Sequence, residues 1–388
     1  MNIKFMDVRS QNKTISLWFI TLLVFFAIPQ QVYSANEQQW IQVPEANYAD
    51  VLELIVLRAK ANYDEISSWQ GRINIMETIH HYGMNAAEMV RVDKNVLKGD
   101  TQHICSIDKT VAEFAVDMRE DKLYSSVKPA VQFKAVDLDQ YVPLAKGIKI
   151  SSRIRTVLTP DSWMSYEPDF NYAPKFHQGR PNKMVFINVP TEVKGGQNGE
   201  IRDPRIFFNS GGENKKLWDT LLQIKSNINE RIKERVAGYP HIEISSLNTD
   251  KSIRYRILTT WRGGENYVMK YIRSLLEVDE AVGFNTTKVE VSSPDGVKLT
   301  SQQYTYEQIG EMYVPKTVKK EQRNNKGDIT DTSEITIETT GINKPLPEDT
   351  FTIKNLGVEE DAIVTNNIKK AEFRYSKGNL VPIADTNE

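Results

Sequence analysis

Two stretches of the chain repeat apolar residues at the spacing of an α-helix. In the first, apolar side chains recur every three or four residues, at Tyr48, Val51, Leu52, Ile55 and Ala59, so they share one side of a helix. In the second, an apolar stripe crosses a segment rich in Lys and Glu, and it consists of Leu217, Trp218, Leu221, Leu222, Ile224, Ile228 and Ile232. We predict one helix beginning near Tyr48 and another at about residues 213–236.

The first predicted helix is apolar on more than one side. Six of the seven residues from Val51 to Leu57 are apolar, whereas a surface helix needs only one apolar stripe. We therefore expect this helix to lie between two layers or under the concave side of a sheet.

Much of the remaining chain alternates apolar and polar residues, as a half-buried β-strand does. Trp69, Gly71, Ile73 and Ile75 alternate with polar neighbours, so one side of this strand is expected to face the core. Further strands are predicted at Val111–Met118, Lys149–Thr156, Met184–Val189, His241–Leu247, Ile253–Thr260, Lys288–Ser292, Val297–Thr305, Glu311–Glu321 and Ser333–Thr340. Tyr267–Leu276 fits a helix or a strand, and its flanking turns favour the strand.

Short turns such as Pro294-Asp295-Gly296 separate these strands, which favours antiparallel pairing. The elements together predict an α+β fold, a curved antiparallel sheet around one or two helices. We place the main domain at residues 35–365, with the second helix inside an expanded middle. Residues 168–181 and 191–204 are the least structured stretches, and the polar tail at 366–388 is expected to bury little.

The N-terminus has the order of a secretory signal. Three basic residues precede an apolar run from Ile15 to Ile28, and small residues follow at Ser34 and Ala35. The run is shorter than the roughly 20 apolar residues that span a bilayer. We expect residues 1–34 to be a signal peptide cleaved after Ser34 or Ala35, and the protein to be exported to the periplasm or cell envelope. The alternative is an uncleaved N-terminal anchor.

Composition argues against several function classes. The signal holds three of the 49 Lys and Arg residues and one of the 51 Asp and Glu residues, so the mature chain has a net charge of −4. Nucleic-acid binding would require a basic surface. Cys105 is the only cysteine, so the chain has no internal disulfide, and a buried, inert thiol is the simplest expectation.

No residue pattern predicts a reaction, a metal site or a cofactor. His80 and His81 are neighbours on a predicted strand and point to opposite faces, whereas His103 and Cys105 share one face but have no second pair of ligands. The segment Ser106 to Lys109 matches the S-x-x-K pattern of serine acyl enzymes. A chain of this length is expected to contain such a pattern by chance, and the companion motifs S-D-N and K-T-G are missing. We therefore expect no enzymatic activity, although paired carboxylates of a hydrolase remain an open alternative.

Aromatic residues crowd one segment after the central strands. Trp163, Tyr166, Phe170, Tyr172 and Phe176 lie within fourteen residues, interrupted by prolines. A loop this rich in aromatic residues packs on the body of the protein or contacts a ligand. Both readings stay open.

Three C-terminal elements resemble motifs of a known superfamily. Leu276 to Phe284 resembles a strand and turn that end in D-x-x-x-G-[FY], and Tyr304 to Lys316 resembles an x-G-x-[WY]-x-P strand. Ile342 to Phe351 resembles a closing N-x-x-[LI]-P-x-x-x-F element. With the first helix and the Trp69-x-Gly71 strand, they are similar to the outer-membrane lipoprotein-carrier (LolA-like) superfamily. The resemblance implies a strongly curved antiparallel half-barrel covered on its concave face by helices, and periplasmic binding of acyl chains, lipoproteins or other hydrophobic ligands without catalysis.

Two functions follow as expectations. In the first, the protein shelters a hydrophobic small molecule, lipid or lipoprotein, and peripheral contact with a membrane or a membrane protein is compatible with this role. The expected ligand-binding residues are Leu52, Ile55, Trp69, Ile73, Ile75, Trp163, Tyr166, Trp218 and Leu221. In the second, the protein is an exported structural or interaction protein whose helices fill the same concave face.

Overall fold

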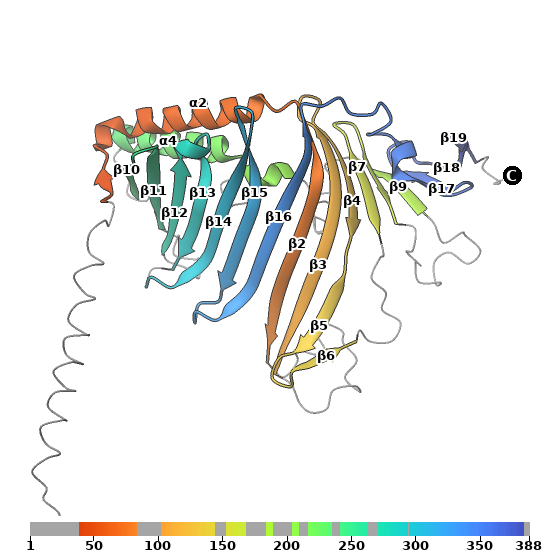
Figure 1. The fold of residues 1–388 in the computed structure, drawn as a ribbon, viewed down its shortest axis with the longest axis horizontal. Helices are drawn as coiled ribbons and strands as arrows, with labels where there is room; N and C mark the ends of the chain where they lie inside the picture. Colours follow the sequence, from red (N-terminus) through yellow and green to blue (C-terminus); the bar gives the residue numbers. More distant parts are fainter. Residues whose placement is uncertain are drawn as a thin grey trace, which may run out of the picture.

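The computed structural model describes residues 39–83, 102–143, 153–167, 184–188, 204–208, 216–234, 241–262, 271–293 and 295–383. In this part of the chain, nineteen strands form one large open sheet, accompanied by two α-helices, α2 (Tyr48–Asp64) and α4 (Leu217–Glu234). Figure 1 shows α2 lying across one end of strands β10 to β15, with α4 beside it. Both helices predicted from the sequence are confirmed.

The strands divide into a long central group and two flanking groups. The central group contains β1 (Ile41–Gln42), β2 (Ser68–Tyr82), β3 (His103–Asp117), β10 (His241–Asn248), β11 (Ile253–Arg262), β12 (Tyr271–Asp279), β13 (Asn285–Ser292), β14 (Lys298–Ile309), β15 (Met312–Arg323) and β16 (Ile329–Ile342). The flanking strands are β4 (Lys122–Lys128), β5 (Val131–Ala135), β6 (Gln140–Val142), β7 (Ile154–Leu158), β8 (Trp163–Tyr166), β9 (Met184–Asn188), β17 (Ile363–Asn366), β18 (Ala371–Ser376) and β19 (Asn379–Pro382).

Antiparallel pairing dominates the sheet, as predicted. From β10 to β16 each strand pairs with the next one in sequence. Strand β2 then joins the two halves of the chain, because it pairs with β16 on one side and β3 on the other, with Trp69 opposite Ile342 and Val116. Among the described strands, only β9 and β17 pair in parallel.

Alternation along the strands gives the sheet one apolar face, which we call the inner face. On β2 it bears Trp69, Ile73 and Ile75, while the exposed side chains of Arg72 and Met76 point to the opposite, outer face. The inner-face residues form one continuous core with residues of both helices. The helices therefore pack against the inner face. Figure 1 shows that they lie at one end of the strands.

Helix α2 is covered on one side. Leu52, Ile55 and Ala59 are buried in the core, but Leu54 and Leu57 on the other side are 38% and 62% exposed. Of the two positions expected for this helix, the one between two layers is therefore wrong for the described structure, and the one under the concave side of a sheet stays a prediction. The excess apolar residues give α2 a partly apolar outer surface.

The strand predictions are confirmed for the long central strands, although β3 begins at His103, well before the predicted start at Val111. The ambiguous segment is a strand in its described part, as β12 begins at Tyr271. Trp163 to Tyr166 form strand β8 instead of the expected aromatic loop. The rest of that aromatic segment, from Phe170 to Phe176, lies outside the described residues.

The C-terminal segment expected to be a polar tail is folded through residue 383. It contributes β18 and β19, and Tyr375 is buried in a second apolar cluster with Leu356, Val364 and Val185. Of residues 366–383, only Asn366 and Tyr375 are buried, and Phe373 and Leu380 pack partly buried against the same cluster.

Among the described residues, no helix is long and apolar enough to cross a membrane. The predicted signal peptide and its cleavage point lie outside the described residues. Cleavage after Ser34 or Ala35 stays a prediction.

Candidate functional site

Most of the residues predicted to bind a ligand come together on the inner face. Seven of them belong to one core contributed by α2, β2 and α4, and they are Leu52, Ile55, Trp69, Ile73, Ile75, Trp218 and Leu221. Tyr166 packs instead in the second cluster, on the opposite side of β8. Trp163 is buried on β8, directly across from Leu158, a residue that borders the inner-face core.

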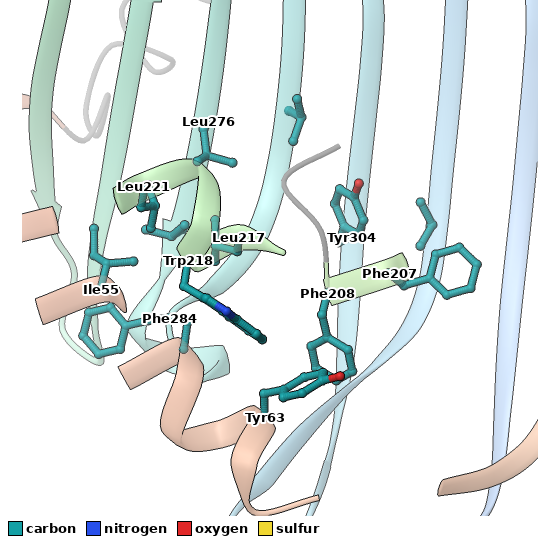
Figure 2. Close-up of a cluster of buried hydrophobic side chains, with 14 of the residues drawn as sticks. Ile55, Tyr63, Phe207, Phe208, Leu217, Trp218, Leu221, Leu276, Phe284 and Tyr304 are labelled. Carbon is teal, nitrogen blue, oxygen red and sulfur yellow. The ribbon is translucent and has the colours of Figure 1, made fainter. Parts of the chain in front are cut away.

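A short helix and the start of α4 insert aromatic side chains into this core (Figure 2). The helix η4 (Pro204–Phe208) places the Phe208 ring 5.2 Å from Tyr63 of α2 and 5.9 Å from Trp69 of β2. Trp218 packs edge-on against Tyr63 at 4.9 Å. These edge-to-face contacts connect α2, α4 and the sheet through one aromatic group.

Sequence reasoning missed the contribution of η4. Phe207 and Phe208 are adjacent apolar residues outside any predicted helix or strand. The dipeptide itself was the available signal, because two adjacent large aromatic residues in a polar stretch rarely stay exposed. Its position on the inner face depends on a contact between segments more than a hundred residues apart.

The inner face extends beyond the part that the helices cover. Along β2, buried residues are frequent up to Ile75, whereas every residue from Met76 to Tyr82 is at least partly exposed. Ile335 of β16 lies directly opposite Ile75 and is a partly buried member of the core border. The next inner-face pair along these two strands is Glu77 and Ser333, so the apolar core ends close to the isoleucine pair.

The C-terminal end of α2 is fixed to the sheet by polar contacts. The Asn62 side chain accepts a hydrogen bond of 2.7 Å from the Tyr313 backbone N–H and donates one of 2.9 Å to the Tyr313 carbonyl. Asn343 Nδ2 donates to the Glu65 carbonyl at 2.8 Å, and Asn343 Oδ1 accepts from the Ser67 backbone at 2.6 Å. Buried backbone groups seldom remain unpaired, so these bonds hold the helix end in one position.

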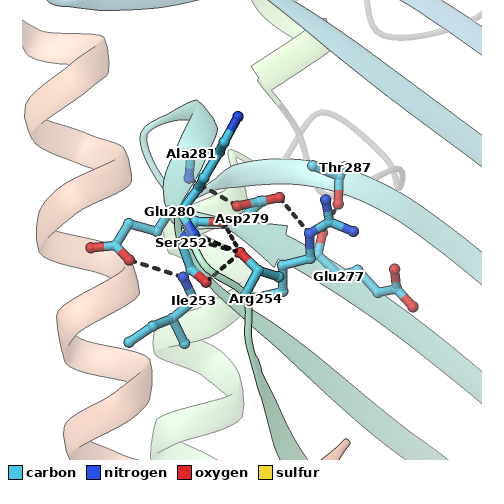
Figure 3. A network of polar contacts seen from close by, with 10 residues as sticks. Ser252, Ile253, Arg254, Glu277, Asp279, Glu280, Ala281 and Thr287 are labelled. Atoms are coloured by element: carbon cyan, nitrogen blue, oxygen red, sulfur yellow. Dashed lines mark hydrogen bonds and ion pairs between the residues drawn. The ribbon is translucent and has the colours of Figure 1, made fainter. Parts of the chain in front are cut away.

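The Asp279 turn contributes to the same anchorage (Figure 3). Asp279 accepts hydrogen bonds from the Ala281 backbone N–H at 2.8 Å and from Arg254 Nε at 2.7 Å. Gly283 then adopts a φ of 70°. An added Cβ there would lie 3.1 Å from the Tyr313 ring of β15 and 3.5 Å from the Asn62 side chain of α2. Tyr313 and Asn343, which lie in two of the three motif segments, thus bond directly to the C-terminal end of α2 and the residues that follow it.

A surface groove of about 420 Å³ lies beside this turn, between α2 and the loops that follow β12 and β14. Its wall includes Leu54, Arg58, Tyr255, Phe284 and Glu311. The groove adjoins the outer side of α2. The expected ligand site between the helices and the inner face is a separate feature and stays a prediction.

His80, His81 and His103 lie at the far end of the β2–β3 hairpin, away from the helices. His80 Nδ1 and His103 Nε2 are 2.8 Å apart, and His81 contacts Ser106 on the opposite side. Burial lowers the pKa of His80, and the neighbouring His103 lowers it further. The opposite orientation of His80 and His81 is confirmed.

Cys105 is buried, as expected. Burial raises the pKa of its thiol and so disfavours the reactive thiolate. Within the described residues, no group of three or more His, Cys, Asp or Glu side chains is arranged to hold a metal ion.

No family model and no curated protein matches this chain. The structure is similar to a LolA superfamily protein from Nitrosomonas europaea, with 14% sequence identity and a TM-score of 0.33 over 78% of this chain and 98% of that chain. It is also similar to a putative outer membrane lipoprotein-sorting protein domain from Vibrio parahaemolyticus, with 11% identity and a TM-score of 0.29 over 79% and 99% of the two chains. At these identities and TM-scores the two similarities assign neither a ligand nor an activity to this chain.

Proposed function

We propose that this protein is an exported, non-enzymatic binding protein that holds an acyl chain, a lipoprotein or another elongated hydrophobic ligand against the inner face of its sheet. The observation that supports the proposal is the apolar inner face, which extends from the residues in contact with α2, η4 and α4 to the border at Ile75 and Ile335.

Elongated apolar ligands suit such a face for energetic reasons. Each methylene transferred from water to an apolar surface contributes about 0.8 kcal/mol, so a chain of about ten carbons gains on the order of 8 kcal/mol before the entropic cost of binding. The ordered aromatic group of Tyr63, Phe208 and Trp218 limits one end of the ligand site. In this proposal α4 and η4 act as the lid over that end.

A structural role is the second candidate, and a specific observation favours it. Leu52, Ile55, Trp69, Ile73 and Leu221 are fully buried by one another and by neighbouring core residues. If this packing extends over the whole inner face, the helices themselves occupy the expected ligand site. The protein would then support an interaction made elsewhere on its surface.

Titration with the uncharged fluorescent probe N-phenylnaphthylamine distinguishes the two candidates. The binding protein should give a saturable fluorescence increase, and decyl glycerol ether should displace the probe. A thermal unfolding curve of the same preparation serves as the control for folding. A folded protein that gives no saturable signal would contradict the binding function and favour the structural one.

A further inference from the structure

One stretch of the inner face carries small hydroxyl residues where the rest is apolar. Ser125 of β4 lies directly across from Thr156 of β7, which lies directly across from Ser165 of β8. Leu123 and Val127 lie two residues before and after Ser125 on β4, and Ile154 lies two residues before Thr156 on β7, so they point to the same face as the hydroxyl residues. All three belong to the inner-face core. The hydroxyl row therefore faces the same side as the proposed ligand.

Polar atoms in and beside this row are buried without a partner. Ser125, Thr156 and Trp163 are 0%, 1% and 7% exposed. Within the described part of the structure, Ser125 Oγ, Thr156 Oγ1 and Trp163 Nε1 form no hydrogen bond. Trp163 precedes Ser165 by two residues on β8, so its indole lies on the same side of the sheet.

Such a cluster is unusual in a folded protein. Buried polar side chains nearly always have hydrogen-bond partners, and an unpaired group is commonly satisfied by something that binds there. Three unpaired groups on three neighbouring strands and on one face point to a single polar group of a ligand. An indole N–H only donates, so that ligand group must include a hydrogen-bond acceptor.

The surroundings favour an uncharged acceptor. The inner-face positions of the described parts of β4, β7 and β8 carry no charged side chain. Arg155 lies between Ile154 and Thr156 but points to the outer face, where its Nη1 donates to the Leu356 carbonyl at 2.6 Å. A buried carboxylate without a cation would be strongly disfavoured, whereas a neutral carbonyl would not.

We propose that Ser125, Thr156 and Trp163 bind the carbonyl group of an ester- or amide-linked acyl chain whose hydrocarbon part lies on the apolar inner face. This assignment rests on the proposed binding function and specifies its ligand class: neutral acyl esters or amides in preference to free fatty acids or plain hydrocarbons.

The test compares two neutral ligands that differ in one carbonyl. Monodecanoyl glycerol carries an ester carbonyl, and decyl glycerol ether lacks it. In displacement of N-phenylnaphthylamine from the mature protein, the ester should bind about tenfold more tightly than the ether, as one or two uncharged hydrogen bonds predict. Decanoate, which has a charged head, should bind more weakly than the ester.

Isosteric variants then locate the effect. Thr156→Val should remove most of the ester preference while leaving the affinity for the ether unchanged, and Ser125→Ala provides a second, smaller replacement if the first variant unfolds. Ser126→Ala is the matched control, because Ser126 Oγ is also buried and unpaired among the described residues but lies opposite Arg155, on the other side of β4. It should keep the ester preference.

Each outcome has a separate meaning. Binding of the ester and the ether with equal affinity to the wild-type protein would overturn this inference and leave the binding function in place, with a buried water as the partner of the hydroxyls. Loss of the ester preference in Ser126→Ala would also overturn it. Failure of the probe and both ligands to bind would overturn the binding function itself, and this inference with it.

Discussion

Gly283 is the residue at which the turn after β12 comes closest to α2. Its φ of 70° is unfavourable for any residue with a Cβ, and an added Cβ would lie 3.1 Å from the Tyr313 ring and 3.5 Å from the Asn62 side chain. Gly310 has a similar φ of 64° but nothing within 4 Å of the position of a Cβ. Substitutions at these two glycines therefore distinguish the free-energy cost of the backbone conformation from the additional cost of steric contact.

We expect Gly310→Ala to lower the free energy of unfolding by about 1 to 2 kcal/mol, the usual cost of a left-handed conformation. Gly283→Ala should cost more than this, because Tyr313 or the end of α2 must also move. Chemical denaturation of both variants measures the difference. Equal losses would show that the turn does not hold α2 against the sheet.

His80 makes stability depend on pH. Its pKa in the folded protein is lowered, first by burial and then by His103, whereas in the unfolded chain it has the ordinary value of about 6.5. The unfolded state therefore binds more protons below that pH, so the contribution of His80 is present above about pH 6.5 and is lost as the pH falls toward the folded pKa.

We expect the wild-type protein to lose stability between about pH 7.5 and about pH 5.5, and His80→Gln to lose less over the same interval. His241→Gln is the control, because the His241 side chain is exposed on β10, where its Nε2 lies 2.8 Å from a carboxylate oxygen of Glu243. Denaturation midpoints at the two pH values give the result. An identical loss in all three proteins would contradict this account of His80.

At the scale of elements, α4 offers a neighbouring pair of leucines in different environments. Leu221 is fully buried in the inner-face core, whereas Leu222 is 48% exposed. Leu221→Ala should cost about 2 to 5 kcal/mol, because it removes buried methyl groups and leaves a cavity. Leu222→Ala should change stability by about 0.5 kcal/mol or less.

Thermal or chemical unfolding measures both leucine variants. A small effect of Leu221→Ala would mean that α4 is weakly attached to the sheet and contributes little to the core. A large effect would establish α4 as an integral part of the fold that a ligand must accommodate or displace.

The sequence predicted the long elements well because each has a strong period. Strands β10 to β16 alternate over eight or more residues, and α4 has a single clear stripe. Strand β4 was missed because Ser125 and Ser126 are both buried and remove the alternation of apolar and polar residues. Strands β5, β6, β18 and β19 are short, and pairing with neighbours decides their conformation more than local propensity does.

At the scale of the whole molecule, the candidate site joins segments from most of the chain. Pairing of β2 with β16 brings the N-terminal α2 beside the C-terminal motifs, where Asn62 bonds to Tyr313 and Ser67 to Asn343. The apolar residues of the site could be predicted from their periodicity. The insertion of Phe208 and the placement of the hydroxyl row could not, because both depend on contacts between distant segments.

The central claim is that an acyl ligand lies on the inner face, at the border of the core. The isoleucines Ile75 and Ile335 face each other there, whereas their neighbours Met76 and Glu334 point to the outer face. A photoactivatable ligand carrying a diazirine on its acyl chain can therefore report which face it contacts.

The most direct test is to irradiate the mature protein with such an acyl ester and to locate the crosslinks by peptide mass spectrometry. Our account predicts crosslinks at inner-face residues such as Ile75 and Ile335, suppressed by an excess of monodecanoyl glycerol. Crosslinks confined to outer-face residues such as Met76 and Glu334, or labelling that the excess ester does not suppress, would contradict it.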